Sequence, residues 1–293
     1  MAPRTPVRAM IGPQDEAGTA AISGASGVIR SVDGVPIAYD SHGSGASALV
    51  LVHGWGCDRS YWSAQVRHFA PLRRVITVDL AGHGESGSGR SDRSIGNFGG
   101  DVAAVLAAED VTEGTLVGHS LGGPVVVEAA IAARGRVAAV VGVDTFSDGW
   151  RLPAYSAALE GIEADFAGFV ERQRHAMFLP TSPPALVDRI MADMALQHAA
   201  SGIGAMRGLA GWGGARFAVA LGELGVLGVP LGLVATSSRM EAIASLRAAE
   251  SQLSVLRIVE MGGAGHFLMC EDPPRFNRLL TALDAELRSD PGR

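Results

Sequence analysis

The sequence predicts an α/β fold in which a mostly parallel sheet is covered by helices on both faces. Short, continuous apolar runs alternate along the chain with segments of helical period, a pattern typical of strands that are buried on both sides. The chain has 293 residues, enough to bury a large core. No stretch reaches the roughly 18 uncharged apolar residues that a membrane-spanning helix needs, so we expect no such helix.

The N-terminal half provides most of the strand signals. Apolar runs at 28–32 and 35–39 flank the turn pair Asp33 and Gly34, which predicts an opening hairpin. Asp58 is a plausible N-cap for the helix that follows the next strand. Further strands are predicted at 48–52, 74–78, 111–117 and 137–143, and helices at 59–69, 95–108 and 125–133.

The character of the chain changes between Gly149 and about Gly225. This segment is helical in composition, rich in aromatic residues and methionine, and lacks a strand signal. We expect most of its large apolar side chains to form its own core and a minority to face a pocket. The alternation then resumes with strands at 230–235 and 253–261 and helices at 240–250 and 274–287.

The most informative motif is GHSLG at residues 118–122, between a predicted strand and a predicted helix. A serine on such a sharp turn must adopt a strained backbone, and glycines two residues before and after it leave room for the neighbouring strand and helix. Backbone N–H groups at the start of the helix can then receive a developing oxyanion. The pattern predicts that Ser120 is a nucleophile.

Three further motifs follow predicted strands in a consistent order: HGWG at 53–56, DLAGHGES at 79–86 and GHF at 265–267. Together with GHSLG they resemble the α/β-hydrolase family, in its serine esterase and lipase-like branch, from about Gly27 onward. The resemblance implies a doubly wound, eight-stranded, mostly parallel sheet with a helical cap inserted after the sixth strand. It divides the chain into a flexible N-terminal extension (1–26), a hydrolase core (27–148 and 226–293) and a cap (149–225).

The resemblance also indicates the base and the oxyanion hole. A serine hydroxyl is a poor nucleophile without a base within hydrogen-bond reach. His266 lies after the last strand, where the family places its histidine, and flanking glycines let the loop bend toward the serine. The oxyanion hole is expected from the backbone N–H groups of Leu121 and Trp55. The motifs that contain His53, His83 and Asp79 are structural in the family, and His119 occupies the variable position of the elbow.

The third member of a catalytic triad departs from the common family pattern. Most members carry an acid after the seventh strand, but residues 235–240 contain none, and the nearest carboxylate, Glu241, is expected inside the next helix. The loop after the sixth strand offers Asp144 and Asp148 instead. Certain lipases and haloalkane dehalogenases place the acid there, so we predict Asp144. Asp148, which with Gly149 resembles a turn, Glu241 and the absence of any acid stay open as alternatives.

The predicted function is a serine hydrolase that cleaves carboxylic esters of small to medium hydrophobic substrates. A serine at the elbow argues against dehalogenases and epoxide hydrolases, which need an aspartate nucleophile. Other serine-dependent reactions on this fold remain open: hydrolysis of C–C bonds or lactones, acyl transfer and haloperoxidase-like chemistry. A ligand-binding protein that has lost turnover is a further alternative, because the loop after the seventh strand lacks an acid.

Composition excludes several other classes. The balance of 24 basic and 30 acidic residues gives a net charge of −6 without any basic run, which argues against a nucleic-acid partner. All 24 basic residues are Arg, so Schiff-base or P-loop lysine chemistry is impossible. We expect no cofactor and no metal.

Cys57 and Cys270 form no C-x-x-C pair and are expected as free thiols, with a bridge between them less favoured. The N-terminal 26 residues lack the uninterrupted apolar region of a secretory signal, so we expect a cytoplasmic protein. The oligomeric state cannot be predicted from the sequence.

Overall fold

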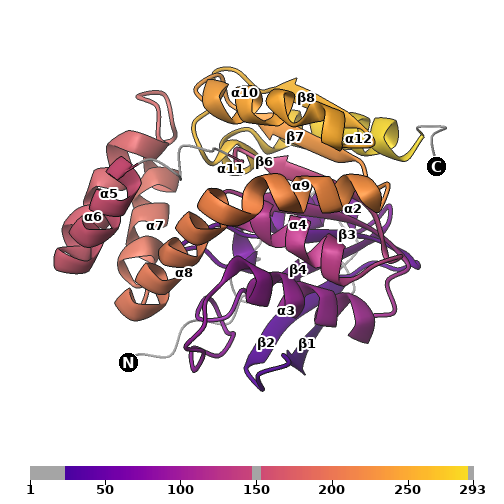
Figure 1. Ribbon diagram of the computed structural model, residues 1–293, viewed down its shortest axis with the longest axis horizontal. Coiled ribbons are helices and arrows are strands. Elements are labelled where there is room, and N and C mark those ends of the chain that lie inside the picture. The colour runs from indigo at the N-terminus through magenta and orange to yellow at the C-terminus, as the bar shows by residue number, and fades with distance from the viewer. Residues whose placement is uncertain (1–23, 147–152, 290–293) are drawn as a thin grey trace, which may run out of the picture.

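A computed structural model describes residues 24–146 and 153–289, which contain one eight-stranded sheet (Figure 1). The strand order is β1-β2-β4-β3-β5-β6-β7-β8. The first two pairings, β1 with β2 and β2 with β4, are antiparallel, and all the others are parallel. The predicted fold class is therefore confirmed. The strands are β1 Gly24–Arg30, β2 Pro36–His42, β3 Ser47–Val52, β4 Arg74–Val78, β5 Glu113–His119, β6 Val137–Val143, β7 Leu231–Ala235 and β8 Leu256–Glu260.

Helices cover both faces of this sheet, which explains why strands such as β6 are buried along their whole length. On one face α3, α4 and α9 pack together, and α4 also contacts β5 and β6. On the other face α12 packs against β6, β7 and α2. The helical elements of the core are η1 Arg59–Trp62, α2 Ser63–Phe69, α3 Ile95–Ala108, α4 Gly122–Ala132, α10 Met240–Ala248, η4 Glu250–Gln252, α11 Leu268–Glu271 and α12 Pro273–Arg288.

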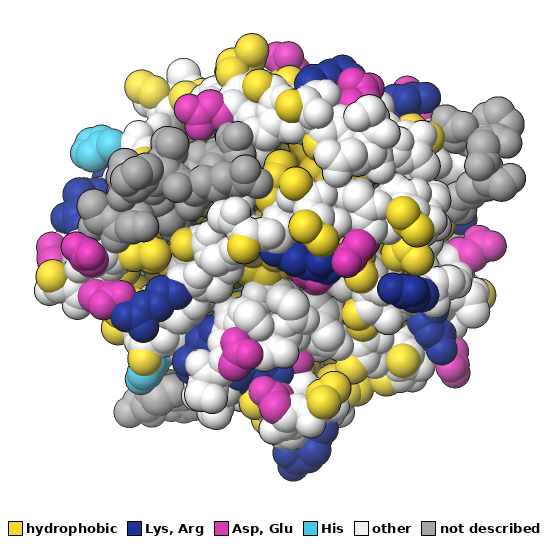
Figure 2. Space-filling model, in the orientation of Figure 1, with side chains coloured by type: hydrophobic (Ala, Val, Ile, Leu, Met, Phe, Trp, Pro, Cys, Tyr) yellow, Lys and Arg dark blue, Asp and Glu magenta, His cyan; other side chains and the backbone are white. Residues whose placement is uncertain are grey.

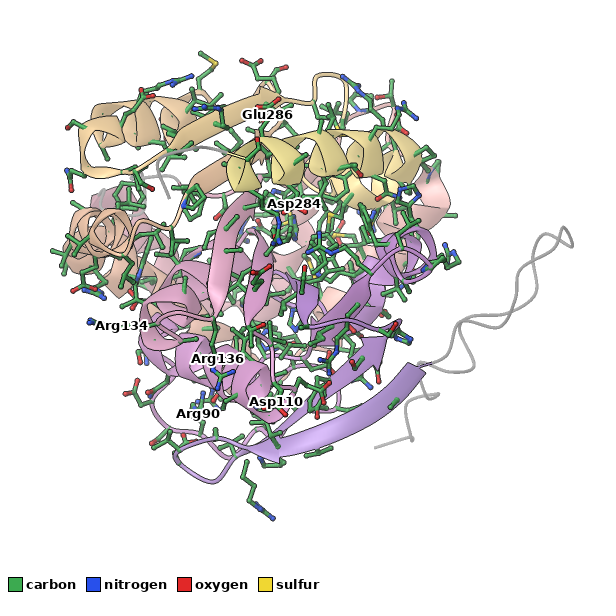
Figure 3. All side chains as sticks on the ribbon, turned by 90° about the vertical axis from the view of Figure 1, so that its right-hand side faces the viewer. Arg90, Asp110, Arg134, Arg136, Asp284 and Glu286 are labelled. Atoms are coloured by element: carbon green, nitrogen blue, oxygen red, sulfur yellow. The ribbon has the colours of Figure 1, made fainter. Side chains whose placement is uncertain are left out.

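Helix α12 is held on the sheet by an apolar stripe and by one inward-facing carboxylate. Its side chains Phe276, Leu280 and Leu283 are almost completely buried. Asp284 points toward the sheet, where it accepts a hydrogen bond from the hydroxyl of Thr115 (2.5 Å), whereas Glu286 points away (Figure 3). The helix is thereby fixed directly behind the strands that lead to the candidate site.

A helical insert follows β6, as predicted. Its helices α5 to α8 form a separate layer beside the carboxyl ends of the strands (Figure 1), and α9 packs against α4 of the core. The predicted start of the cap at residue 149 lies outside the described residues, so the domain division stays a prediction. The insert contains α5 Pro153–Ala164, α6 Phe166–Met177, α7 Pro184–Ala195, α8 Ala199–Gly211, the π-helical turn η3 Trp212–Arg216 and α9 Phe217–Val226.

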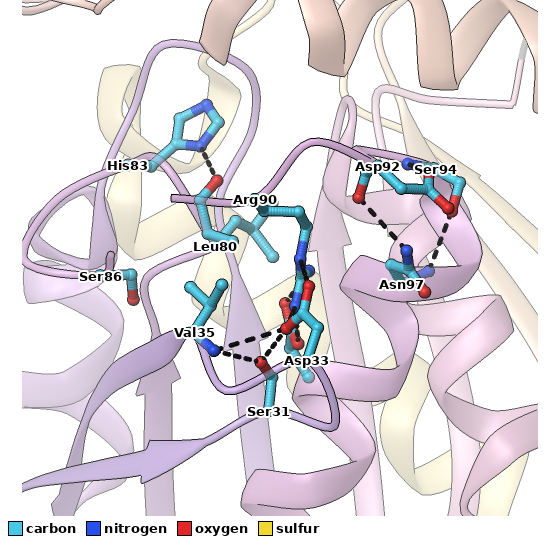
Figure 4. Close-up of polar contacts among 12 residues, drawn as sticks. Ser31, Asp33, Val35, Leu80, His83, Ser86, Arg90, Asp92, Ser94 and Asn97 are labelled. Atoms are coloured by element: carbon cyan, nitrogen blue, oxygen red, sulfur yellow. Dashed lines mark hydrogen bonds and ion pairs between the residues drawn. The ribbon is translucent and has the colours of Figure 1, made fainter. Parts of the chain in front are cut away.

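Two buried arginines connect the loops around the sheet. Arg90 pairs with Asp33 in the β1–β2 turn (2.7 Å; Figure 4) and with Asp101 in α3 (2.6 Å). Arg59 pairs with Asp40 of β2 (2.6 Å) and also bonds to the carboxylates of Asp79 and Glu85 in the loop after β4. Each arginine therefore joins at least two elements that lie far apart in sequence.

Several element boundaries differ from the prediction. Strand β1 begins at Gly24 and ends before Val32, which is fully exposed in the turn. Gly27 pairs with Tyr39, whose ring lies over it: a Cβ atom at Gly27 would lie 2.3 Å from that ring, so a larger residue would have to displace the tyrosine side chain. The predicted helix 59–69 is a 3-10 turn followed by α2, and the Asp58 side chain caps its start by accepting from the Ser60 N–H (2.9 Å).

Acidic and basic side chains are interspersed on the face of the molecule shown in Figure 2. No helix in the described ranges has the length and apolar character needed to cross a membrane. Cys57 is buried, Cys270 is half-buried, and both thiols are free.

Candidate active site

Ser120 occupies the tight turn between β5 and α4 and has a left-handed backbone conformation, with φ at 51°. Its N–H donates to the carbonyl of Val143 (3.0 Å), and its own carbonyl accepts from the Thr145 hydroxyl (2.6 Å). These bonds attach the strained residue to the end of β6. Left-handed backbone is uncommon for residues other than glycine and must be held in place by its surroundings.

The glycines on both sides of Ser120 are sterically required. A Cβ atom at Gly118 would lie 2.1 Å from the carbonyl oxygen of Gly122, and one at Gly122 would lie 2.6 Å from the carbonyl oxygen of Val52. Strand, turn and helix can therefore approach each other closely only because these positions lack side chains. This is the physical basis of the GHSLG pattern.

His266 reaches the same region from the loop after β8. Its ring is 6% exposed, and its Nδ1 atom lies 2.6 Å from the Oδ2 atom of Asp144. Its backbone N–H donates to the carbonyl of Met177 at the end of α6 (2.8 Å). Within the described residues, the Ser120 hydroxyl makes no hydrogen bond to His266; catalytic hydrogen bonds are often long or poorly aligned until substrate binds.

Asp144 lies directly after β6 and is 2% exposed. Its backbone is left-handed, with φ at 49°, and its N–H donates to Val234 of β7 (2.8 Å). Its Oδ1 atom accepts from the N–H (3.0 Å) and the hydroxyl (2.8 Å) of Thr236. The structure thus brings Asp144 to His266, while Glu241 lies exposed in the first turn of α10. Asp148 lies outside the described residues.

Arg239, from the loop after β7, is a further member of this cluster. Its Nε atom lies 2.8 Å from Asp144 Oδ2, and its Nη2 atom lies 2.9 Å from His266 Nδ1. Sequence reasoning missed both Arg239 and Thr236 because it searched this loop for a carboxylate. The usable signal was an arginine in the loop where most family members carry the acid.

The protonation states of the pair follow from burial and charge. Burial raises the pKa of Asp144, but the hydrogen bond from His266 and the charge of Arg239 outweigh it and lower the pKa well below its usual range. Burial is the largest effect on His266 and lowers its pKa; Asp144 opposes this shift and Arg239 adds to it. At neutral pH, Asp144 is therefore ionised and His266 is a neutral imidazole.

His119, at the variable position of the elbow, holds the histidine loop. Its Nε2 atom lies 2.9 Å from the carbonyl oxygen of His266, and its ring centroid lies 4.6 Å from that of His266. Burial lowers the pKa of His119 far below its ordinary value, so the ring is neutral and donates from Nε2. The residue before the candidate nucleophile and the candidate base are therefore directly connected.

Of the two residues predicted for the oxyanion hole, Leu121 directly follows Ser120, and Trp55 belongs to the loop after β3. Leu121 is completely buried and caps the start of α4. A Cβ atom at Gly54 would lie 3.2 Å from the Cβ atom of Ser120, so the loop that contains Trp55 passes directly beside the candidate nucleophile. The Trp55 side chain turns to the cap, where its Nε1 donates to Gly202 of α8 (2.9 Å).

Aromatic side chains from the core and the cap surround these groups. The Trp55 ring meets Phe169 and Phe166 of α6 edge-on, at centroid distances of 5.5 Å and 5.9 Å. Phe178 of the cap stacks on Phe267, next to His266, at 5.5 Å. The cap thus contributes apolar surface close to the candidate base.

The other motif residues have structural contacts. His53 Nε2 accepts from the N–H of Leu80 (3.0 Å), and Asp79 accepts from the N–H of Arg59 (2.7 Å). In the part of the chain that the structure describes, no cluster of three or more His, Cys, Asp or Glu side chains could hold a metal ion.

A serine at a sharp strand-to-helix turn of a mostly parallel eight-stranded sheet, with an acid after β6 and a histidine after β8, is the arrangement of a hydrolase class. The model of the alpha/beta hydrolase family matches residues 49–279. The chain belongs to this family.

Curated relatives include esterases and transferases. The chain is 30% identical over 169 residues to a pimeloyl-(acyl-carrier protein) methyl ester esterase of Pectobacterium carotovorum, covering 55% of this chain and 64% of that protein. It is 28% identical over 192 residues to a dihydrolipoyllysine-residue acetyltransferase component of the acetoin cleaving system of Cupriavidus necator. This alignment covers 64% of this chain and 48% of that protein. The chain thus spans less than two thirds of the length of these relatives.

Solved structures share the fold over most of their length. An esterase from Rhodococcus sp. is 25% identical with a TM-score of 0.71, and the alignment covers 89% of this chain and 99% of that one. A bromoperoxidase from Bacillus anthracis has a TM-score of 0.77 at 19% identity, with 88% and 99% covered. Because the identity to the bromoperoxidase is only 19%, that similarity shows a shared fold and nothing about activity.

Proposed function

We propose that this protein is a serine hydrolase that cleaves carboxylic esters through an acyl-enzyme on Ser120. The observation that carries the proposal is the left-handed Ser120 at the β5–α4 turn, whose neighbour His119 contacts a neutral His266, and the Nδ1 atom of His266 lies 2.6 Å from an ionised Asp144. This arrangement leaves Nε2 of the imidazole as a proton acceptor, because Asp144 fixes the tautomer with the proton on Nδ1.

In the proposed mechanism, the Ser120 oxygen attacks the ester carbonyl carbon while His266 Nε2 takes the hydroxyl proton. The negative charge that develops on the carbonyl oxygen is stabilised by the N–H groups of Leu121 and Trp55; losing one such donor costs about 2.7–4 kcal/mol in a serine protease of unrelated fold. When the tetrahedral intermediate collapses, the bond to the alcohol breaks and His266 returns the proton to the departing oxygen.

Deacylation repeats these steps with water. His266 Nε2 removes a proton from a water molecule, whose oxygen attacks the acyl carbon, and the proton then passes to the Ser120 oxygen as the carboxylic acid leaves. Asp144 stays ionised throughout and stabilises the imidazolium that forms twice per turnover.

The substrate is proposed to be a small to medium hydrophobic ester. The aromatic rings of Trp55, Phe178 and Phe267 near the site support this class, as does the methyl ester esterase among the relatives. The identity of the acyl and alcohol groups needs a substrate panel, because the fold and the triad do not set specificity.

The test combines turnover with covalent labelling. Wild-type protein is expected to release p-nitrophenol from esters of acetate to octanoate and to be labelled by a fluorophosphonate. Ser120→Ala should lose labelling and lower kcat on the order of 10⁶-fold, because the attacking oxygen is gone. The matched control, Ser245→Ala, removes a hydroxyl that bonds only to the helix backbone at Glu241 and should behave as wild type.

Two results would overturn the proposal. Labelling that persists in Ser120→Ala would place the nucleophile elsewhere. Absence of both turnover and labelling in the wild type, for every acyl length, would favour a ligand-binding protein.

A further inference from the structure

The guanidinium of Arg239 contacts both groups that are proposed to activate the candidate nucleophile, His266 and Asp144. Its Nε atom contacts Asp144 Oδ2 at 2.8 Å, the same oxygen that lies 2.6 Å from His266 Nδ1, and its Nη2 atom lies 2.9 Å from that nitrogen. The side chain of Arg239 is 33% exposed, while that of Asp144 is 1% exposed. A partly exposed cation therefore contacts both members of a buried acid–base pair.

Two arrangements of protons are possible for a neutral imidazole, and each satisfies only one of the two contacts at Nδ1. A guanidinium only donates hydrogen bonds. If Nδ1 of His266 carries a proton, that proton goes to Asp144 and Nε2 is free to accept one, as a general base must. If Nδ1 instead accepts from Arg239, the proton lies on Nε2 and the ring cannot deprotonate a serine. The short contact with Asp144 favours the first arrangement, and the guanidinium competes with it.

Among the residues that the structure describes, Asp144, Glu271, Arg239 and His119 act on His266, and they do not act in the same direction. Asp144 and Glu271 favour the imidazolium, whereas Arg239 opposes it. His119, whose ring lies beside that of His266, is kept neutral by burial. Arg239 thus supplies the fixed positive charge of this set, and it pairs with the very carboxylate that would otherwise attract a proton to the ring.

We propose that Arg239 is a positioning residue that holds the Asp144 carboxylate in place and opposes protonation of His266. Thr236 and Arg239 together replace the acid that most family members carry after the seventh strand, and they fix the acid that follows the sixth. As a result, the imidazole stays unprotonated, and able to act as a base, to lower pH than an Asp–His pair without the cation would allow. The role in turnover rests on the proposed function, but the effect on the imidazole does not.

The direct test is an NMR titration of His266 in the full-length protein with ¹⁵N-labelled histidine, in which His266→Gln identifies the signal. In Arg239→Gln the titration midpoint is expected to rise by about one pH unit, because a cation in contact with the pair is lost. Arg239→Lys, which keeps the charge, is expected to retain a midpoint close to that of the wild type. Arg247→Gln, in the same segment but paired with Glu250, is the matched control for loss of one positive charge.

The proposal is overturned if the midpoint in Arg239→Gln equals that of the wild type or of Arg247→Gln. It is also overturned if Arg239→Lys rises as far as Arg239→Gln, since charge would then not be the cause. If the glutamine variant does not fold, the lysine variant is compared with the wild type: an unchanged midpoint supports the proposal, and a rise of about one pH unit overturns it.

A second readout connects this effect to turnover. The probe is p-nitrophenyl acetate. In Arg239→Gln, the acidic limb of the pH profile of kcat/KM should shift to higher pH by as many pH units as the NMR midpoint, since only neutral His266 acts as a base. At a fixed pH below both limbs, a shift of one unit lowers kcat/KM about tenfold. If no ester is hydrolysed, the proposed function fails while the NMR titration still decides the role of Arg239.

Discussion

The carboxylate of Asp144 accepts four hydrogen bonds although it is nearly inaccessible to solvent. Two come from Thr236, one from Arg239 and one from His266. A buried charge is tolerated only when it is paired and hydrogen-bonded in this way. The four donors fix both oxygens of the carboxylate and therefore the orientation of the imidazole.

Asp144→Asn is predicted to lower kcat by about 10⁴-fold, by analogy with triad acids elsewhere. The amide retains the shape of the side chain but cannot stabilise an imidazolium. Esterase assays should detect this loss, whereas Glu241→Gln, a change at the exposed alternative acid, should leave kcat unaltered. A nearly normal rate in Asp144→Asn would move the role of the acid to Asp148 or Glu241.

At the residue scale, the sequence predicted the strained backbone at Ser120 but not the polar contacts around it. Ser120 was predictable because left-handed backbone between two close-packed segments requires glycines at fixed spacing. Arg239 was not, because its pairing with Asp144 depends on how two strand ends meet in space. His119 was missed for the same reason, since its partner is a backbone carbonyl 147 residues away.

The short helix α11 connects the candidate base to the cap. Glu271 in this helix accepts from the N–H of Gly265 (3.0 Å) and from the hydroxyl of Ser182 (2.9 Å), which lies between α6 and α7. The Ser182 hydroxyl in turn accepts from the N–H of Leu179 (3.0 Å). One carboxylate therefore links the histidine loop to the nearest turn of the cap.

Glu271→Gln is predicted to loosen both segments. The amide cannot reproduce charge-assisted bonds worth about 1.5–3 kcal/mol each, so amide hydrogen exchange should speed up about tenfold in peptides that cover 177–182 and 265–271. Mass spectrometry of exchanged peptides measures this directly. Glu250→Gln, on an exposed pair with Arg247, serves as the control, and equal exchange in the two variants would contradict the link.

Element boundaries were less predictable than the elements themselves. Strand β1 includes glycines of low strand propensity, and the rings of His42 and Tyr39 in β2 fill the space beside Gly24 and Gly27. Helix α4 begins at Gly122, three residues before the predicted start, because the elbow passes directly into it. Helix α11 spans only four residues and has no periodic signal.

Across the whole molecule, the buried arginines Arg59 and Arg90 form ion pairs that connect the N-terminal strands to the loop after β4 and to α3. The Arg59 side chain is 3% exposed and bonds to three carboxylates, on Asp40, Asp79 and Glu85. Asp79 also accepts from the backbone of Arg59 and of Glu85. Loss of this guanidinium would leave acidic groups buried without a counter-charge.

Arg59→Met is therefore predicted to lower the free energy of unfolding by about 3–5 kcal/mol, the usual cost of removing one partner from a buried ion pair. Urea unfolding followed by circular dichroism measures the change. Arg207→Met removes an arginine from an exposed pair with Glu163 and should leave the midpoint unaltered. A similarly small effect of Arg59→Met would mean that the network adds little to stability.

The alternation of strands and helices made the fold class predictable, since it depends only on local periodicity. The strand order was not contained in that pattern: β4 lies between β2 and β3 in the sheet, a crossover that is set by packing of the connections on the two faces. The cap was recognisable by its lack of strands. How the end of α6 meets His266 was not, because that contact depends on a long-range hydrogen bond from the His266 N–H to the carbonyl of Met177.

The hydrogen bond between His119 and the carbonyl of His266 spans 147 residues of chain. During synthesis, the elbow leaves the ribosome long before its partner loop exists. A folding intermediate that has formed only the first six strands would hold a strained serine with no base beside it. Such a chain would be chemically inert, and its reactivity would arise only when the last strand and helix dock onto the sheet.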